Sequence, residues 1–236
     1  NDQAMTVVIT IVLINCSLYI TSNLLIYFFK YDIGGAGWNA NYVLFNTFGG
    51  GIQIISMMLF YPLFRKFISA MQVFYVSFVM AIGGYAVLLA LMFTNRTNIY
   101  ILMIPGFFIF TAFGMLTVLT TVFLANTVDY GELKNNRRDE SVIFSMQTFV
   151  VKLASGVAAM IASICLTISN ISNDTSTEAA AMVSDSYTSV AVLRMTMTVL
   201  PIIGLLVAVF IFAKKYILTD EKLGEINQEL AHRHKA

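Results

Sequence analysis

Charged residues are scarce in this sequence. Asp, Glu, Lys and Arg together make up 11% of the 236 residues, whereas soluble domains carry about 25%. The net charge is +1, which implies neither a strongly basic nor a strongly acidic partner and gives no reason to expect nucleic-acid binding. Hydrophobic residues make up 58% and the mean hydropathy is +0.78. The sequence therefore predicts an all-α protein that crosses a lipid bilayer several times.

Residues that carry metal or nucleophile chemistry are scarcer still. Cys16 and Cys165 lie within apolar segments and are interpreted as packing residues, and His232 and His234 lie in the polar tail. No zinc site, haem site or Cys–His nucleophile can be assembled from these residues. The apolar segments also contain no nucleophile–base pair. We therefore expect a protein that is not an enzyme and has no cofactor.

Six apolar segments are long enough to cross a bilayer, which takes about 20 residues in a helix. They must be helical because their backbone polar groups find no water in the bilayer. They cover residues 5–29, 42–61, 71–93, 99–128, 142–168 and 190–213. Pro105 and Pro201 fall in the fourth and sixth segments, where we expect them to kink or break the helices. The chain is thus divided into a six-helix membrane bundle, residues 1–215, and a tail, residues 216–236.

The Lys and Arg residues between these segments indicate how the chain is oriented, because cytoplasmic connections are enriched in them. Lys30, Arg96 and Arg194 fall on one side. The other side carries Arg65, Lys66, Lys134, Arg137, Arg138, Lys214, Lys215, Lys222, Arg233 and Lys235. We expect a multi-pass protein of the cell membrane, inner or plasma, with both ends of this chain in the cytoplasm and the polar connection 169–188 outside.

The tail has the pattern of a short amphipathic helix over residues 219–230. Thr219 is a candidate N-cap, and Asp220 and Glu221 suit the first turn. Leu223, Ile226 and Leu230 share one apolar face. This pattern predicts a helix that lies along the cytoplasmic surface.

Lys152 is the charge that the membrane environment makes most informative. With Lys30, Arg96 and Arg194 assigned to connections, it is the only charge within an apolar segment. It lies about eleven residues into the fifth segment, which at ~1.5 Å per residue is about 16 Å deep and near the bilayer centre. A lysine there costs at least ~2.5 kcal/mol unless it faces water or a partner. Snorkelling is the alternative, but the interface is beyond the reach of one side chain from that depth. We predict a functional role, with a carboxylate partner on another polypeptide segment.

Lys152 belongs to a polar stripe on one helical face. The stripe consists of Ser141, Ser145, Thr148, Lys152 and Ser155, at steps of 4, 3, 4 and 3, and Gln147 borders it. Such a stripe is unfavourable against lipid and is expected against a water-filled cavity. Interhelical packing is the alternative, and it accounts for Ala154, Ala158 and Ala162 but not for a lysine.

Shorter polar stripes occur on the first, second and fourth segments. Each alone is more typical of helix packing than of a binding surface. Together with Lys152 they favour a polar cavity enclosed by helices, with the lining candidates Asn15, Tyr19, Ser22, Asn46, Gln53, Thr117, Thr121 and Ser145. Uncharged donors and acceptors suit a hydroxylated solute such as a sugar, and Tyr19 can stack on the apolar face of a sugar ring.

The connection over residues 129–140 is short and dense in charges of both signs. One interpretation is a solvated connection that obeys the charge bias of membrane proteins. The other is a cytoplasmic clasp of ion pairs, formed by Asp129, Glu132, Arg137 and Arg138, that stabilises one face of a moving transporter. The sequence leaves both open.

Two motifs resemble a known transporter family. Residues 126–132 read Asn-Thr-Val-Asp-Tyr-Gly-Glu, and residues 145–152 read Ser-Met-Gln-Thr-Phe-Val-Val-Lys. The opening Asn-Asp-Gln and the tail segment 216–222 are also similar to that family. It is the glycoside–pentoside–hexuronide:cation symporter family. The resemblance covers the whole chain, as the C-terminal six-helix half of a twelve-helix major facilitator fold.

The resemblance implies sugar:cation symport by alternating access, driven by Na⁺, Li⁺ or H⁺. Lys152 matches the family's eleventh-helix lysine, associated with cation and sugar coupling, and Thr148 and Gln147 match neighbours that line the same site. The family's cation-binding aspartates lie in the N-terminal half, which agrees with the missing partner of Lys152. The implied partners are that six-helix half, a small sugar and the lipid bilayer.

Two alternatives to symport remain. A self-contained six-span protein that dimerises as a half-transporter or channel would bring two lysines to one cavity without a carboxylate, which is unfavourable. A membrane scaffold without transport function leaves Lys152 and the polar stripe without an explanation.

Overall fold

The structure, a computed structural model, describes residues 1–94, 98–169, 171 and 187–233. Its elements are α1 (Asp2–Tyr27), the π-helical η1 (Phe28–Ile33), α2 (Trp38–Ile55), the π-helical η2 (Ser56–Phe60), α3 (Tyr61–Arg65), α4 (Ala70–Phe93), α5 (Ile99–Asn135), α6 (Glu140–Ile168), α7 (Tyr187–Lys215) and α8 (Asp220–Arg233). Most of the connection 169–188 lies outside the described residues, as do Arg96, His234 and Lys235.

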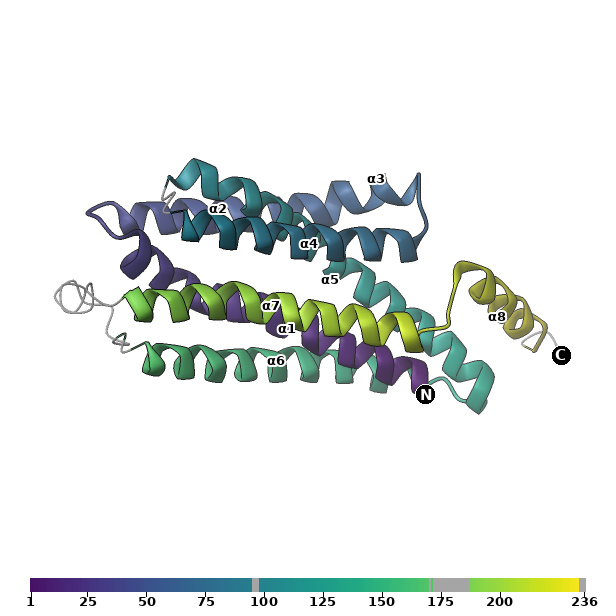
Figure 1. Cartoon of the computed structure of the whole chain (residues 1–236). Helices are drawn as coiled ribbons and strands as arrows, with labels where there is room; N and C mark the ends of the chain where they lie inside the picture. Colours follow the sequence, from purple (N-terminus) through teal and green to yellow (C-terminus); the bar gives the residue numbers. More distant parts are fainter. Residues whose placement is uncertain (95–97, 170, 172–186, 234–236) are drawn as a thin grey trace.

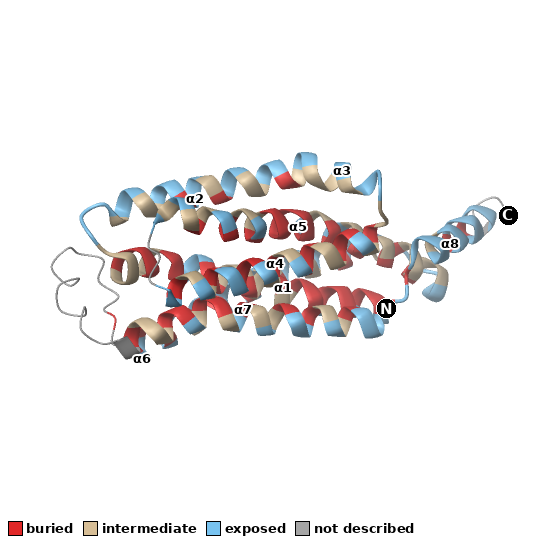
Figure 2. Ribbon diagram, turned by 45° about the horizontal axis from the view of Figure 1, so that its top comes forward, coloured by how far each residue is buried: buried red, intermediate tan, exposed pale blue. Residues whose placement is uncertain are grey.

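Within the described residues, six helical stretches are long and apolar enough to span a membrane, which confirms the predicted six-span bundle. η1 continues α1, and η2 and α3 continue α2, so the first two spans run over Asp2–Ile33 and Trp38–Arg65. The long helices lie side by side, and α8 lies beyond the end of the bundle that also holds Asn1 (Figure 1). We call this the N-terminal end. The buried residues gather on α1 and α5, whereas α2 and α8 are mostly exposed (Figure 2).

Local capping interactions fix where several helices begin and end. Ser69 and Gln72 form a reciprocal capping box at the start of α4. The Asn98 side chain accepts a hydrogen bond from the Tyr100 backbone N–H at 3.0 Å and so caps α5. α5 ends at Asn135, and the left-handed φ of 53° at the following residue, Asn136, closes the helix.

α5 and α7 do not break at their prolines, and α5 extends beyond the predicted segment 99–128. Both helices continue through their prolines, Pro105 and Pro201, without a break, because neighbouring helices can supply partners for the backbone groups that a proline frees. α5 also runs on to Asn135, so Asp129 and Glu132 lie on a helix and not in a connection. The helix can continue through these charged residues because its end projects from the bilayer, where their side chains reach water or the Arg138 guanidinium.

The tail helix α8 packs against the protein. Ile226 and Leu230 on its apolar face are buried, at 4% and 7% exposure, and α8 contacts α5. Asp220 at its start lies 3.8 Å from Arg65 of α3. The apolar face of α8 is therefore buried against the protein, and its predicted location along the cytoplasmic surface stays a prediction.

α5 approaches α2 and η2 closely at Gly114. A Cβ there would lie 2.6 Å from the Gln53 carbonyl oxygen and 2.7 Å from the Ser56 Cβ, and the Ser56 hydroxyl donates to the Thr111 carbonyl at 2.6 Å. Gly114→Ala is therefore expected to lower the free energy of unfolding by about 1–3 kcal/mol through overpacking.

Thermal unfolding followed by size-exclusion chromatography in detergent measures the effect of Gly114→Ala. The matched control is Gly83→Ala, since a Cβ at Gly83 meets no atom of the described residues within 4 Å. Equal melting temperatures for the two variants would contradict the close approach of α2 and α5.

Candidate functional site

A cavity of about 540 Å³ opens between α1, α2, α5 and α6. This volume falls within the ~300–1,000 Å³ that is typical of small-molecule sites. Its lining consists of Ile11, Ile14, Asn15, Leu18, Tyr19, Ser22, Asn46, Gly50, Gln53, Phe110, Thr117, Thr120, Gln147 and Val151. None of these lining residues, all within the described part of the chain, is charged. The cavity therefore suits an uncharged polar solute.

The structure brings most of the predicted lining residues together. Six of the eight candidates face this cavity, namely Asn15, Tyr19, Ser22, Asn46, Gln53 and Thr117. Thr121 lies at its edge, where its hydroxyl accepts a hydrogen bond from Gln147 Nε2 at 3.0 Å. Ser145 is exposed on α6 and does not line the cavity. Ser145 lies on a different face of α6 from Gln147.

The polar groups around the cavity differ in how far their hydrogen-bonding capacity is already used. The Thr117 hydroxyl donates to the Phe113 carbonyl at 2.8 Å, and the Asn15 amide donates to the Ile11 carbonyl at 2.9 Å. Among the described residues, the Asn46 and Gln53 side chains have no hydrogen-bond partner. Each free carboxamide offers two donors and an acceptor. Asn46 and Gln53 are thus the groups on the cavity wall most available to a solute.

The apolar part of the wall was not predicted. Ile11, Ile14, Leu18, Phe110 and Val151 line the cavity between its polar groups. Their spacing could have predicted this, because Ile11 and Leu18 lie one helical turn before Asn15 and Ser22 and so share a face with them. Phe110 and Tyr19 give the cavity two aromatic faces, against which the apolar face of a ring can pack.

Lys152 lies outside the cavity, on an exposed face of α6. Gln147 and Val151 turn toward the cavity, whereas Thr148 and Lys152, one residue further along, turn away from it. The cavity and the lysine stripe therefore lie on different faces of α6, and the predicted role of Lys152 stays a prediction. In the part of the chain that the structure describes, Lys152 has no hydrogen-bond or ion-pair partner.

α6 exposes two faces of opposite character. One is the lysine stripe, of which Ser141, Ser145, Thr148, Lys152 and Ser155 are all exposed. The other is apolar and includes Phe149, Leu153, Met160 and Ile164, at 66%, 48%, 60% and 51% exposure. At 100° per residue the two faces point roughly 120° apart. The apolar face suits lipid, and the polar face suits water or another polypeptide.

The sequence analysis did not predict a buried ion pair that lies at the end of the bundle away from Asn1. Arg194 of α7 donates to Asp32 of η1 from Nε at 2.7 Å and from Nη2 at 2.5 Å. The Arg194 and Asp32 side chains are 10% and 3% exposed. Lys152 is therefore not the only charge within a span. The sequence held a signal, since Arg194 already falls inside the predicted segment 190–213.

The charged connection between α5 and α6 forms a compact cluster around Arg138. Its guanidinium lies 2.8 Å from Glu132, 3.2 Å from Asp129 and 3.2 Å from Glu140. The hydrogen bond with Glu132 is the main cause of a raised Arg138 pKa, so this side chain stays cationic. Arg137 does not join the cluster and pairs with Asp139 at 2.6 Å. Since Arg138 is half exposed, the pairs contribute little to stability.

Comparisons with known proteins place the chain in a family. The family model described as MFS/sugar transport protein matches residues 1–220. A lactose permease of Lactobacillus delbrueckii subsp. bulgaricus is 30% identical over 234 residues, 98% of this chain and 35% of that protein. A raffinose carrier protein of Pediococcus pentosaceus is 27% identical over 237 residues, 98% of this chain and 34% of that protein. An isoprimeverose transporter of Lactiplantibacillus pentosus is 26% identical over 147 residues, 61% of this chain and 29% of that protein.

The chain spans about a third of the length of the lactose permease and the raffinose carrier. The family match agrees with the resemblance to the glycoside–pentoside–hexuronide:cation symporters, and the six helices have the length and composition of membrane spans. The chain therefore belongs to the MFS/sugar transport protein family, and its six-helix bundle is the C-terminal half of a major facilitator fold.

Proposed function

We propose that this chain is the C-terminal half of a sugar:cation symporter that works by alternating access. The observation that carries the proposal is the uncharged polar cavity between α1, α2, α5 and α6. Two six-helix halves would rock about this cavity and open it to one side of the membrane at a time. The relatives named as lactose, raffinose and isoprimeverose carriers support a sugar as the class of substrate.

The wall chemistry favours a neutral glycoside over an ion. A charged solute in a low-dielectric site needs a countercharge, and the lining residues named above provide none. A glycoside needs hydrogen-bond donors and acceptors for its hydroxyls, which Asn46 and Gln53 offer, and an apolar surface for its ring faces. Tyr19 and Phe110 provide that surface.

The lysine stripe of α6 supports a second half that covers it. A lysine that faces lipid near the bilayer centre costs at least ~2.5 kcal/mol, so Lys152 belongs against water or a carboxylate. In the proposed transporter the N-terminal half provides that carboxylate. A coupling cation, Na⁺, Li⁺ or H⁺, competes with Lys152 for it. Cation binding then changes the charge beside the cavity and alters the sugar affinity, and the sugar alters the cation affinity by the same factor.

Uptake of labelled neutral glycosides, pentosides and a hexuronide into vesicles that contain the full transporter tests the proposal. We expect at least one sugar to accumulate above its external concentration when a Na⁺, Li⁺ or H⁺ gradient is imposed, and a matching ionophore to abolish the accumulation. Sugar equilibration that no cation gradient drives would support a uniporter or channel instead. Absence of uptake across the panel would overturn sugar transport.

The two free carboxamides sharpen this test. Asn46→Ala and Gln53→Ala are each expected to raise the KM for the transported sugar about tenfold, since each removes hydrogen bonds worth ~1.5 kcal/mol to a bound solute. The matched control is Asn39→Ala, because Asn39 is exposed on α2 outside the cavity. An unchanged KM in both cavity variants would argue against this wall as the sugar site.

A further inference from the structure

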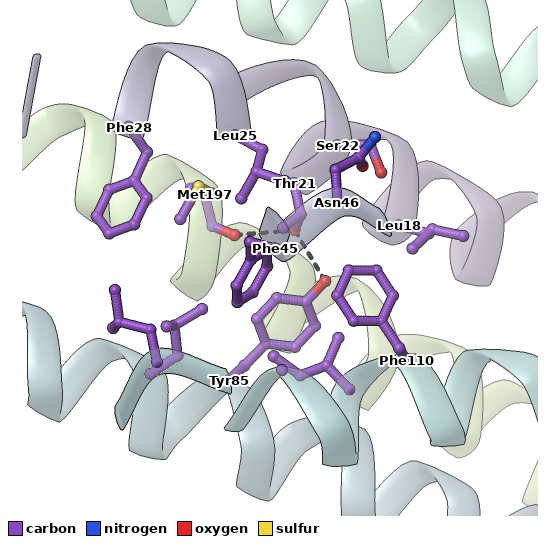
Figure 3. A pocket seen from close by; sticks show the side chains of 14 residues that line it. Leu18, Thr21, Ser22, Leu25, Phe28, Phe45, Asn46, Tyr85, Phe110 and Met197 are labelled. Carbon is purple, nitrogen blue, oxygen red and sulfur yellow. Dashed lines mark hydrogen bonds between the residues drawn. The ribbon is translucent and has the colours of Figure 1, made fainter. Parts of the chain in front are cut away.

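Pro201 leaves one carbonyl of α7 without its helical partner. In an α-helix the N–H of residue 201 would donate to the carbonyl of residue 197, and proline has no N–H. The Met197 carbonyl instead accepts a hydrogen bond from the Thr21 hydroxyl at 3.0 Å. Thr21 belongs to α1, so a side chain of one span compensates for the proline of another (Figure 3).

Tyr85 of α4 completes this hydrogen-bond chain. A carbonyl can only accept, so the single Thr21 proton goes to Met197, and the longer contact of 3.4 Å to the Ser17 carbonyl is secondary. The Tyr85 hydroxyl, 2.8 Å from Thr21 Oγ1, must therefore donate. Tyr85 is fully buried. Three helices, α1, α4 and α7, thus meet in one directed chain of hydrogen bonds.

α1 and α7 also approach closely one turn before Thr21. The Ser17 hydroxyl lies 3.4 Å from the Pro201 carbonyl oxygen and 2.8 Å from the Leu13 carbonyl oxygen. A Cβ at Gly204 would lie 2.5 Å from the Ser17 hydroxyl oxygen. A larger residue at position 204 would therefore have to displace the Ser17 hydroxyl, so glycine lets α1 and α7 pack closely at this point.

The residues next to this contact line the sugar cavity. Leu18 follows Ser17, Ser22 follows Thr21, and both face the cavity. A chamber of about 20 Å³ is lined by Thr21 and Tyr85 together with Leu18 and Ser22. We propose that Thr21, supported by Tyr85, is a positioning residue for sugar binding. It fixes the rotation of α1 against α7 and so presents Leu18 and Ser22 to the solute. The effect on sugar affinity rests on the proposed function.

Thr21→Val removes the hydroxyl and keeps the side-chain volume. It leaves the Met197 carbonyl and the Tyr85 hydroxyl buried without this partner, so we expect a melting temperature about 3–8 °C lower. With α1 free to rotate, we expect a KM about tenfold higher, with turnover per inserted transporter changed less than about twofold. Thr21→Ser keeps the hydroxyl, so its melting temperature and KM should stay close to those of the unmodified transporter. The matched control is Thr10→Val, because Thr10 is buried on α1 and its hydroxyl bonds only its own helix, at Thr6.

A Pro201→Ala background shows whether Thr21 acts through the Met197 carbonyl, and Tyr85→Phe removes the other group that pairs with Thr21. Alanine returns an N–H to the Met197 carbonyl, so Thr21 is no longer needed to satisfy it. In a Pro201→Ala/Tyr85→Phe background, Thr21→Val is expected to lower the melting temperature by less than half of its effect in the unmodified protein. An undiminished loss, or an unchanged KM in Thr21→Val, overturns the inference. If the unmodified transporter moves no sugar, the proposed function fails, and the melting-temperature comparison still decides the pairing.

An engineered disulfide tests the inference without removing the hydroxyl. The Ser17 Cβ lies 3.9 Å from the Cβ position of residue 204, which fits the ~3.8 Å of disulfides. Ser17→Cys/Gly204→Cys, with Cys16 and Cys165 replaced by Ala, is expected to cross-link on mild oxidation. Uptake should be the same in the oxidised and reduced forms, since α1 and α7 keep this contact through the cycle. A cross-link that blocks uptake contradicts a fixed α1.

Discussion

Arg194→Ala is expected to lower the free energy of unfolding by about 3–5 kcal/mol, because it breaks a buried ion pair. The Asp32 side chain is 3% exposed and receives two hydrogen bonds from the guanidinium, at 2.7 and 2.5 Å. Removal of Arg194 would leave this carboxylate buried without its bidentate partner, and η1 would lose its tie to α7. Because membrane domains are marginally stable, most of the protein should fail to fold.

The yield of monodisperse protein and its melting temperature measure this effect. The paired variant Asp32→Leu/Arg194→Met replaces both charges with apolar groups and should recover most of the loss, since an apolar pair avoids the desolvation penalty. The exposed Asp2–Lys134 pair, also at 2.7 Å, is the control. Asp2→Asn should change the melting temperature very little. A small effect of Arg194→Ala would mean that water reaches this end of the bundle.

Lys152→Ala is expected to reduce cation-driven sugar accumulation by about 100-fold, the upper part of the range for coupling between two sites. In the proposed transporter Lys152 competes with the cation for a carboxylate of the N-terminal half. Alanine removes the competitor, so cation binding no longer changes the sugar affinity of the cavity. Downhill sugar movement should persist, because Lys152 does not line the cavity.

Accumulation ratios and sugar counterflow separate these two expectations for Lys152→Ala. Accumulation needs coupling, whereas counterflow needs only sugar binding and the conformational change. The matched control is Lys66→Ala, since Lys66 is exposed near the end of α3 and outside the membrane-spanning middle of the bundle. Unchanged accumulation and cation dependence in Lys152→Ala would assign the lysine a structural role and refute the proposed coupling.

The helices and much of the cavity wall could be predicted because they follow from local patterns. Hydropathy identifies spans, and a spacing of three or four residues identifies which side chains share a face. Spacing does not reveal where that face points. Gln147 and Lys152 belong to neighbouring faces of α6, and only the packing of α6 against α1 and α5 turns the first into the cavity and the second away from it.

Contacts between distant segments could not be predicted from the same patterns. Asp32 and Arg194 are 162 residues apart, and each sits near the end of a span, where a charge is equally consistent with a solvated connection. The end of α5 was missed for a related reason, since a helix that projects into water loses the apolar character on which the prediction of spans depends. The π-helical segments η1 and η2 have no known sequence signature in this chain.

The link between Thr21 and Pro201 constrains the order in which mutations can accumulate in this chain. We expect loss of the proline first to be tolerated, because the helix N–H then satisfies the Met197 carbonyl and the threonine is no longer needed for this. Loss of the threonine first leaves that carbonyl stranded while the proline remains. Substitution of Pro201 before Thr21 is thus expected to be tolerated, whereas the reverse order is not. The residues next to either position in the sequence give no sign of this dependence.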